Sequence, residues 1–537
     1  MKENFARFEQ LLWIYLKRDW KKIVLWIVLL GLFGGAFVPA FEEIAKGDGL
    51  IGMYQTMDNP ALTAIVGTTP VEAAENYTLG AMYANEMLLF TGLISAIVSA
   101  LHVVGHTRKE EDLGITELIS SFRIGRQANS LAVIIETILI NGLLTIFIGS
   151  IMLIFDANTI VFEGAFLFGA SIGMAGIMGA TIALIMAQII PTSGGATGSS
   201  LGILGFLYLT RGMTDVVNQN LSVINPMSWT YLTYPFTENN WSFLVYLLIF
   251  SIVGFVLAFV LEGNRDIGSG YIQQSVGRLH ARKTLLSVPG VFLRLNRGMI
   301  VTWLIAFVIM GLAYGSIYGD LQSFVESNEM ISQMFQQENM SIEASFTGTI
   351  TLVMIGLVAI LPIVVVNKLF TEEKEQRLNQ MFATKVSRFK IFWVNIGIAI
   401  LSGLVGIFLT SGSLGVAGLG VMDESTALEF SDFIIAGFNQ LPLVLFFIGL
   451  AALVLGFIPK LGKFIYIYLA YSFFIVYFEG LVDFPEWFVK TSIQGWFPQM
   501  PIEEFNGTVF LVITIISIFM IILGYIGYNR RDLIKNA

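Results

Sequence analysis

The 537-residue sequence contains no cysteine and only three histidines, and charged residues make up 13% of it. Without cysteine, neither a disulfide framework nor a thiolate metal site can form. So few charged residues, together with a 55% share of hydrophobic ones and a mean hydropathy of +0.75, lie outside the range of soluble domains. The composition therefore predicts an integral membrane protein. The net charge of −9 gives no sign of a nucleic-acid partner.

Long apolar runs recur along the whole chain. The hydrocarbon layer of a bilayer is ~30 Å thick and needs about 20 apolar residues per helix. The runs are apolar on every side, whereas transmembrane strands alternate over ~10 residues, so the predicted fold is all-α, a polytopic integral membrane protein with about twelve transmembrane helices. The predicted spans lie near residues 23–41, 87–106, 131–154, 164–190, 199–217, 242–262, 299–319, 347–367, 391–417, 433–459, 463–482 and 508–528. Those at 164–190 and 433–459 are long enough to tilt or break.

The distribution of Lys and Arg predicts the orientation, because positive residues are retained on the cytoplasmic side of a membrane. If both termini are cytoplasmic, 27 of the 30 Lys and Arg residues fall in cytoplasmic segments, and only Lys46, Arg211 and Lys490 do not. We therefore expect a multi-pass protein of the bacterial plasma membrane with both termini in the cytoplasm.

Weak internal echoes indicate a duplicated unit. A shift of 262 residues places the segment EEDLGITELISSFRIGR on EEKEQRLNQMFATKVSR, and a shift of 267 pairs Trp229 with Trp496 in two aromatic loops. Echoes in the same order at similar spacing predict one six-span unit used twice in parallel orientation, that is, two six-helix pseudo-repeats. The predicted domains are a first half at 1–262, a cytoplasmic linker at 263–298 and a second half at 299–537.

Each predicted half carries a charged segment after its second span, at 107–126 and at 371–388. In the first, Ile115, Leu118, Ile119 and Phe122 fall on one face of a helix. Basic segments precede the first span of each half, at 7–22 and 291–298, and suit helices that lie in the membrane interface. Any polytopic protein needs charged inner loops, but an apolar face repeated below the membrane predicts docking of a partner that this chain does not supply.

No ATPase motif is present. The nearest approach to a P-loop is GFIPKLGKF at 456–464, where the glycine spacing is one residue too long and Phe464 replaces the Ser or Thr that would bind Mg²⁺. We therefore expect that this chain is not an enzyme and binds no cofactor itself.

The layout and the charged segments together resemble a known family, the membrane subunits of type-2 ABC exporters, and within it the twelve-span permeases of the tetronasin and polyether-ionophore resistance group. The most specific part is the family's coupling-helix pattern: an acidic pair, a glycine, an amphipathic turn and a terminal arginine. The first copy matches this pattern at Glu110, Glu111, Gly114, Leu118 and Arg126. The second copy matches it at Glu372, Glu373 and Arg388, with Gln376 in place of the glycine, and neither copy has the family's proline.

The resemblance implies a function. Two copies of a separate ATPase subunit, which binds ATP and Mg²⁺, would dock under these segments and drive export of an amphipathic drug such as a polyether ionophore. Export of a lipid or cell-wall precursor fits the same layout. An ion-coupled secondary multidrug transporter is an alternative, because such proteins also commonly have six plus six spans. An intramembrane enzyme is a third, because His102 and His106 at i, i+4 form half a metal site, although interfacial polar residues are the usual interpretation.

Polar residues inside the predicted spans are candidates for a substrate pathway, because such residues are costly in a bilayer. They are Glu136, Asn141, Asn439 and Gln440. The alternative for these residues is hydrogen bonding between helices or, for Glu136, pairing with a basic residue near the inner face.

Arg211 is the only arginine inside a predicted span, and Asp215 lies four residues later on the same helix face. A charge at mid-helix costs about 2.5–3.5 kcal/mol on insertion scales, so it should be paired or functional. Two interpretations stay open: a self-contained ion pair, or a guanidinium that receives the carboxylate of an amphipathic substrate while Asp215 holds it in readiness.

Overall fold

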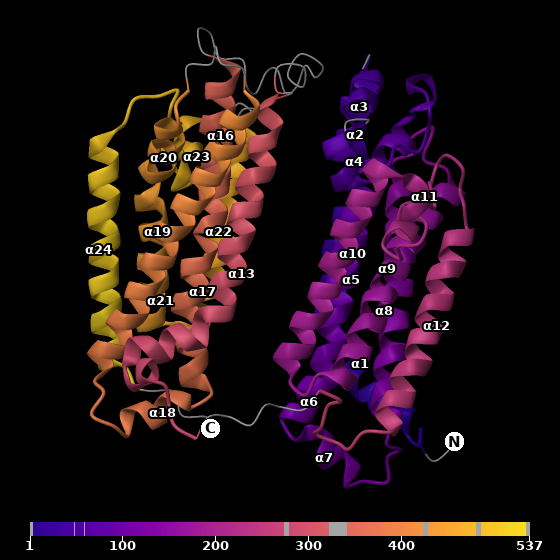
Figure 1. The fold of residues 1–537 in the computed structure, drawn as a ribbon, viewed down its shortest axis with the longest axis horizontal. Helices are drawn as coiled ribbons and strands as arrows, with labels where there is room; N and C mark the ends of the chain where they lie inside the picture. Colours follow the sequence, from indigo (N-terminus) through magenta and orange to yellow (C-terminus); the bar gives the residue numbers. More distant parts are fainter. Residues whose placement is uncertain are drawn as a thin grey trace. The chain divides into compact units, whose positions relative to one another are not determined.

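A computed structural model describes residues 4–47, 49–57, 60–272, 279–319, 321, 341–422, 428–479 and 485–532. Every regular element within these residues is a helix, which confirms the predicted all-α class (Figure 1). The chain forms two compact units, Met1–Gly277 and Arg278–Ala537. The boundary between the units falls inside the predicted linker at 263–298.

The first unit contains the following helices in chain order: α1 (Phe8–Gly35), α2 (Val38–Ile44), α3 (Gly49–Met57), α4 (Pro60–Val66), η1 (Ala74–Asn76), α5 (Leu79–His106), α6 (Arg108–Asp112), α7 (Ile115–Ser120), α8 (Ala128–Ile154), α9 (Phe162–Ile189), α10 (Ser193–Val217), α11 (Gln219–Ser222), η2 (Ser228–Thr230) and α12 (Ser242–Gly263).

The second unit contains η3 (Lys283–Leu286), α13 (Val288–Ser316), η4 (Ile317–Gly319), α16 (Ile342–Val358), α17 (Ile360–Lys374), α18 (Arg377–Phe382), α19 (Arg388–Val421), α20 (Phe430–Asn439), α21 (Leu441–Phe457), η5 (Pro459–Leu461), α22 (Phe464–Glu479), α23 (Glu486–Val489), η6 (Gln494–Trp496) and α24 (Gly507–Arg530). Residues 320 and 322–340, between α13 and α16, lie outside the described residues.

Within the described residues, ten stretches are long and apolar enough to cross a membrane. They are Phe8–Ile44, Leu79–Asp112, Ala128–Ile154, Phe162–Ile189, Ser242–Gly263, Val288–Gly319, Ile342–Lys374, Arg388–Val421, Phe430–Phe457 and Gly507–Arg530. The other two predicted spans are also helical. They are not among the ten for different reasons. Helix α10 is less apolar, because it contains an ion pair and many small polar residues. The described part of α22 is shorter, with 16 residues. The protein is a multi-pass membrane protein.

The predicted interfacial segment 7–22 and the first span form one continuous helix, α1. No proline or glycine occurs between Phe8 and Leu30 to interrupt the hydrogen bonds, so helix propensity carries the backbone across the change in polarity. The predicted segment 291–298 is likewise the beginning of α13 rather than a separate helix.

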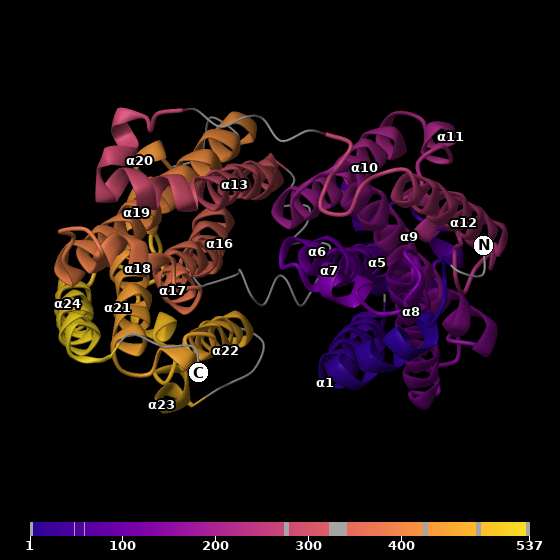
Figure 2. The same cartoon turned by 90° about the horizontal axis from the view of Figure 1, so that it is seen from below.

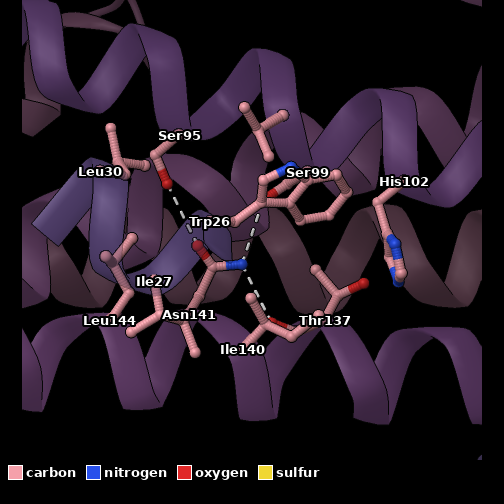
Figure 3. A pocket seen from close by; sticks show the side chains of 11 residues that line it. Trp26, Ile27, Leu30, Ser95, Ser99, His102, Thr137, Ile140, Asn141 and Leu144 are labelled. Atoms are coloured by element: carbon pink, nitrogen blue, oxygen red, sulfur yellow. Dashed lines mark hydrogen bonds between the residues drawn. The ribbon is translucent and has the colours of Figure 1, made fainter. Parts of the chain in front are cut away.

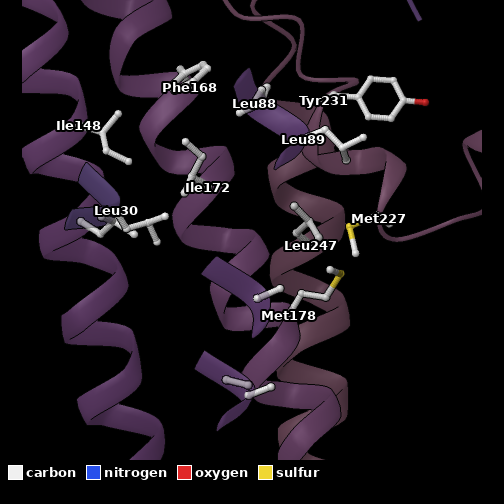
Figure 4. Packing of buried hydrophobic residues seen from close by; sticks show 14 of the residues in the cluster. Leu30, Leu88, Leu89, Ile148, Phe168, Ile172, Met178, Met227, Tyr231 and Leu247 are labelled. Atoms are coloured by element: carbon white, nitrogen blue, oxygen red, sulfur yellow. The ribbon is translucent and has the colours of Figure 1, made fainter. Parts of the chain in front are cut away.

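Helix α9 is the centre of the first unit and packs against α5, α8, α10 and α12 (Figures 1 and 2). Its small residues permit this close approach. A Cβ on Gly179 would lie 2.2 Å from the carbonyl oxygen of Ala96, and one on Gly176 would lie 2.0 Å from the side chain of Asn141. Between these small residues, larger ones such as Phe168, Ile172 and Met178 fill the spaces between helices (Figure 4). Such packing holds helices together where lipid offers no hydrophobic driving force.

The second unit repeats the helix pairing of the first. The first and third long helices pack together in both units, as α1 with α8 and α13 with α19, and the fourth pairs with the last, as α9 with α12 and α21 with α24. The paired tryptophans also match, because Trp229 Nε1 donates to the carbonyl of Val223 at 2.6 Å and Trp496 Nε1 donates to that of Lys490 at 2.8 Å, each six residues earlier. These agreements support the duplication.

The two long predicted spans differ. The run at 164–190 forms the unbroken helix α9, whereas the run at 433–459 is divided into α20 and α21. Pro442 accounts for the break, because it has no N–H to donate and its ring crowds the carbonyl of the residue four earlier.

Candidate functional site

The charged segment of the first unit lies beyond the end of α5 (Figure 1) and is divided by Gly114 into α6 and α7. A single helix over 107–126 is therefore not formed. The backbone of Gly114 is left-handed, with φ of 73°, a conformation that favours glycine. On either side of it, Leu113, Leu118 and Phe122 are each more than 60% exposed. Of the expected apolar face, Leu118 and Phe122 are therefore uncovered within the unit, whereas Ile115 and Ile119 are half-buried.

Glu110 does not face solvent. Its carboxylate is buried and accepts hydrogen bonds from the Tyr15 hydroxyl at 2.9 Å and from the Arg18 guanidinium at 2.8 Å. Both partners belong to α1, more than ninety residues earlier in the chain. Arg18 also bonds Asp19, which Lys22 contacts at 2.7 Å. Glu110 therefore joins the charged segment to the first span.

Glu111 makes a second connection, to the chain that follows the last span of the unit. Its carboxylate receives both terminal nitrogens of Arg265, at 2.7 and 2.9 Å. It also accepts from Arg108 at 2.9 Å. Arg108 is 1% exposed and donates to the carbonyl of Pro191, just after α9, and to those of Gly268 and Ser269, after α12. It therefore joins the chain after α12 to the end of α9.

The second unit has the same connection. The Glu373 carboxylate receives both terminal nitrogens of Arg531, which follows the last span as Arg265 does in the first unit. We refer to the pairs Glu111–Arg265 and Glu373–Arg531 as the two clamps. Each clamp joins residues more than 150 positions apart, and its acidic side chain is nearly inaccessible.

Glu372 has a different partner from its counterpart Glu110. It pairs with Arg377, five residues later on α18, and lies 3.3 Å from Lys368 on its own helix. The hydrogen bond that Arg377 donates to Glu372 raises the pKa of Arg377 above the ordinary value for arginine, so the guanidinium stays charged. The link is local and does not reach the first span of the unit.

The predicted terminal arginines occupy equivalent positions. Arg126 donates to the carbonyls of Glu262 and Arg265 at the end of α12, and Arg388 donates to those of Tyr528, Asn529 and Arg531 at the end of α24. Unpaired carbonyls at a helix C-terminus favour a cation. These arginines therefore fix the last span of each unit to the charged segment.

Gln376 has the left-handed conformation of Gly114, with φ of 59°, and both residues precede the short helix of their segment. The turn is therefore retained in the second unit although the glycine is not. A non-glycine residue in this conformation costs about 1–2 kcal/mol.

Asn141 lies in the interior of the first unit and connects helices (Figure 3). Its Nδ2 donates to Ser99 Oγ at 3.1 Å and its Oδ1 accepts from Ser95 Oγ at 3.2 Å, both on α5. The adjoining cavity holds about 20 Å³, enough for a water molecule and far too little for a drug. These contacts are hydrogen bonds between helices, as the alternative interpretation expects, and a substrate-pathway role for Asn141 stays a prediction.

Glu136, one turn earlier on α8, is completely buried and lies 3.1 Å from Nε2 of His102. It pairs with a histidine rather than with an arginine or lysine. Asn439 and Gln440 are buried in the second unit at the junction of α20 and α21, where Asn439 Nδ2 donates to the carbonyl of Pro498 at 3.0 Å. Asn439 therefore ties the helix break to the loop before α24.

Arg211 and Asp215 form a buried ion pair at 2.8 Å, and neither side chain is exposed. Arg211 also donates to the carbonyls of Ala64 and Ile65, and Tyr231 donates to Asp215 at 2.5 Å. Burial and the Asp215 carboxylate raise the pKa of Tyr231 well above its ordinary value, so the phenol keeps its proton. The geometry has the features of a self-contained pair that fastens α10 to α4, while a substrate role for Arg211 stays a prediction.

A polar cavity of about 620 Å³ lies next to this pair, at the end of the first unit opposite α6 and α7. Asp215, Glu72 and Glu238 line it together with Tyr54 and Gln219. The charged residues that line this cavity are acidic.

Sequence analysis missed the partners of the predicted residues: Tyr15 and Arg18 on α1, and Arg265 and Arg531 after the last spans. A signal for the two arginines existed. Each follows the last span of its half, and Arg265 and Arg531 are 266 residues apart, which is close to the shifts that relate the two halves. No pattern singled out Tyr15, because its contact with Glu110 depends on how α1 and α5 pack.

The fold and these sites define the class: a polytopic membrane protein of two repeated helical units, in which buried ionic clamps hold a charged segment under each unit. A family described as "Multidrug efflux system permease Rv1217c, C-terminal domain" matches residues 285–529. The multidrug efflux system permease protein Rv1217c of Mycobacterium tuberculosis is 26% identical over 530 residues, covering 97% of this chain and 94% of that protein. The chain is thus similar to a multidrug efflux permease through both units.

Proposed function

We propose that this chain is the membrane-spanning permease of a multidrug efflux system and is driven by ATP that two copies of a separate ATPase subunit hydrolyse. The observation that carries the proposal is the similarity to a multidrug efflux permease over 97% of the chain. The duplicated clamps support it, because they make each charged segment a rigid attachment point. ATP and Mg²⁺ would bind in the partner, and both termini of this chain would face it in the cytoplasm of a bacterial cell.

In this proposal the exposed residues Leu113, Leu118 and Phe122 form the docking surface for the ATPase in the first unit. Here the buried acids Glu110 and Glu111 would brace α6 from within, because their carboxylates bind α1 and Arg265 rather than facing solvent. A force applied to α6 would pass through Glu110 to α1 and through Glu111 to the end of α12. Nucleotide-driven movement would therefore displace these helices together.

The proposed substrates are amphipathic drugs, with polyether ionophores as the first class to test. In the described first unit, the cavity beside Asn141 is too small for such a molecule, and the larger cavity beside Asp215 is lined by acidic rather than basic charged residues. Export of a lipid or cell-wall precursor would leave drug accumulation unchanged.

The experiment co-expresses the chain with the ATPase encoded beside its gene and measures co-purification and drug accumulation in cells. Leu118→Glu places a charge on the docking surface and should reduce both the amount of ATPase recovered and drug export at least several-fold. Glu117→Gln, at a neighbouring exposed position of α7, is the matched control and should change neither.

Export that continues without any ATPase subunit, and that stops when the proton gradient is dissipated, would replace the proposal with an ion-coupled transporter. Normal ATPase recovery with Leu118→Glu would show that this surface does not dock the partner.

A further inference from the structure

Two histidines and a glutamate meet inside the first unit, at the end of α5 that adjoins α6. His102 and His106 lie one turn apart on α5, and Glu136 faces them from α8. One ligating atom from each of the three lies within 4.8 Å of the other two. The side chains of His102, His106 and Glu136 are 4%, 10% and 0% exposed. Sequence analysis found the two histidines, but only the packing of α8 on α5 supplies the carboxylate.

The charge of Glu136 requires compensation. Within the part of the chain that the structure describes, its Oε2 contacts His102 and its Oε1 has no hydrogen-bond partner. The nearby carboxylates of Asp19 and Glu110 are matched by Arg18 and Lys22, which bond them directly. A buried, unpaired carboxylate costs several kcal/mol unless a proton or a cation neutralises it.

We propose that His102, His106 and Glu136 form a binding site for a divalent transition-metal ion, for which Zn²⁺ is the best match. Two imidazoles and one carboxylate are a known zinc ligand set, with bond lengths of about 2.0–2.2 Å. Imidazole nitrogen also selects against Mg²⁺ and Ca²⁺, which prefer oxygen ligands. The ion neutralises Glu136 and gives its free oxygen a partner.

The surroundings of His106 have the outer contacts that such sites use. Glu110 lies 3.5 Å from Nδ1 and Asp19 lies 3.5 Å from Nε2, so whichever nitrogen binds the metal, the N–H of the other faces a carboxylate that can accept a hydrogen bond from it. Arg18 donates to Nδ1 of His106 in the present structure. Its side chain is 43% exposed and also bonds Glu110 and Asp19, so it can leave the ring without losing its ionic partners.

A metal at this position would connect α5 with α8 and lie next to Asp19 on α1. It would stabilise the helices that carry the first charged segment. The site does not depend on the proposed export function, since it rests on the geometry of one unit.

The test uses the full chain purified in detergent, stripped with a chelator, exposed to Zn²⁺ and dialysed. We expect about one zinc per chain by elemental analysis, a higher midpoint of thermal denaturation with Zn²⁺, and visible absorption when Co²⁺ replaces Zn²⁺. Glu136→Gln and His102→Gln should each reduce retained zinc at least tenfold and abolish the thermal shift.

His280 provides the control, because it is the third histidine of the chain and is exposed. His280→Gln should keep the zinc and the thermal shift. Folding of the Glu136→Gln protein is checked by its elution as a single species in size-exclusion chromatography, and His106→Gln serves as a second variant if Glu136→Gln aggregates. Any of three results would overturn the proposal: zinc retained at the wild-type level in these variants, zinc lost with His280→Gln, or no zinc bound by the wild-type protein. A proton shared between His102 and Glu136 would then be the remaining way to neutralise the carboxylate.

Discussion

The two units have the same clamp but differ in what else secures them. In the first unit, Glu110 binds Tyr15 and Arg18, more than ninety residues earlier in the chain, and Arg211 fastens α10 to α4. In the second, Glu372 pairs with Arg377 five residues away, and residues 464–476 of α22 include no charged residue. Long-range ionic contacts thus hold the described first unit at both ends, whereas among the described residues of the second unit the one long-range ion pair is Glu373–Arg531.

This difference separates what the duplication preserves from what it does not. The clamps and the arginines that cap the last spans are present in both units, which indicates that attachment of the charged segment to the last span is needed twice. The link from the charged segment to the first span through Glu110 has no counterpart at Glu372, which pairs within the described structure with Arg377 and Lys368. Under the proposed function, a movement of the first segment would displace α1 directly, whereas the second segment would act mainly through α24.

The largest effect is expected from Arg211→Gln, which leaves the buried Asp215 carboxylate without its cation. Breaking a buried ion pair on one side costs about 3–5 kcal/mol. The yield of folded protein in membranes should fall, and Asp215→Asn in the same chain should restore much of it. Arg123→Gln, at an exposed position of the first unit, is the control and should leave the yield unchanged. A double variant no better than Arg211→Gln alone would contradict the structural role.

A smaller effect should distinguish the two first acids. Glu110→Gln weakens the charged hydrogen bonds to Tyr15 and Arg18 and should cost about 1.5–3 kcal/mol. Glu372→Gln should cost under about 1 kcal/mol, because its partners Arg377 and Lys368 are 50% and 36% exposed and solvent screens both pairs. Glu110, by contrast, also binds the hydroxyl of the buried Tyr15. Hydrogen exchange followed by mass spectrometry should show faster exchange in the first turns of α1 for Glu110→Gln. With Glu372→Gln, any change should stay within α18. Equal exchange in α1 for both variants would remove the distinction between the units.

The smallest effect concerns the left-handed turn. Gln376→Gly should stabilise the second unit by about 0.5–1 kcal/mol, since relief of the backbone conformation outweighs the extra freedom of glycine in the unfolded chain. Gly114→Gln is the reciprocal change. It should destabilise the first unit by a similar amount, because open space surrounds its Cβ position and only the φ of 73° opposes a side chain. Thermal denaturation in detergent measures both, and shifts in the same direction would show that the two turns are not equivalent.

Much of the fold could be predicted because apolar runs must be helical in a bilayer, where each backbone N–H and carbonyl needs a partner. The twelve predicted runs are all helical in their described parts, and the residues at each charged segment were found from their repetition. The continuity of α1 was not predicted, because polarity changes at residue 22 while helix propensity does not. The division of the first charged segment at Gly114 was also missed, since periodicity alone does not show where a left-handed residue interrupts a helix.

The sequence by itself determined the class of protein, the positions of the spans and the duplication, because these depend on local composition and on spacing along the chain. The tertiary structure decided the partners. Glu110 and Glu111 have the same chemistry and are neighbours in sequence, yet one binds α1 and the other the chain after α12. His102 and His106 acquire Glu136 in the same way. Successive residues of a helix point in different directions, so the partner of each depends on which distant helix packs against that face.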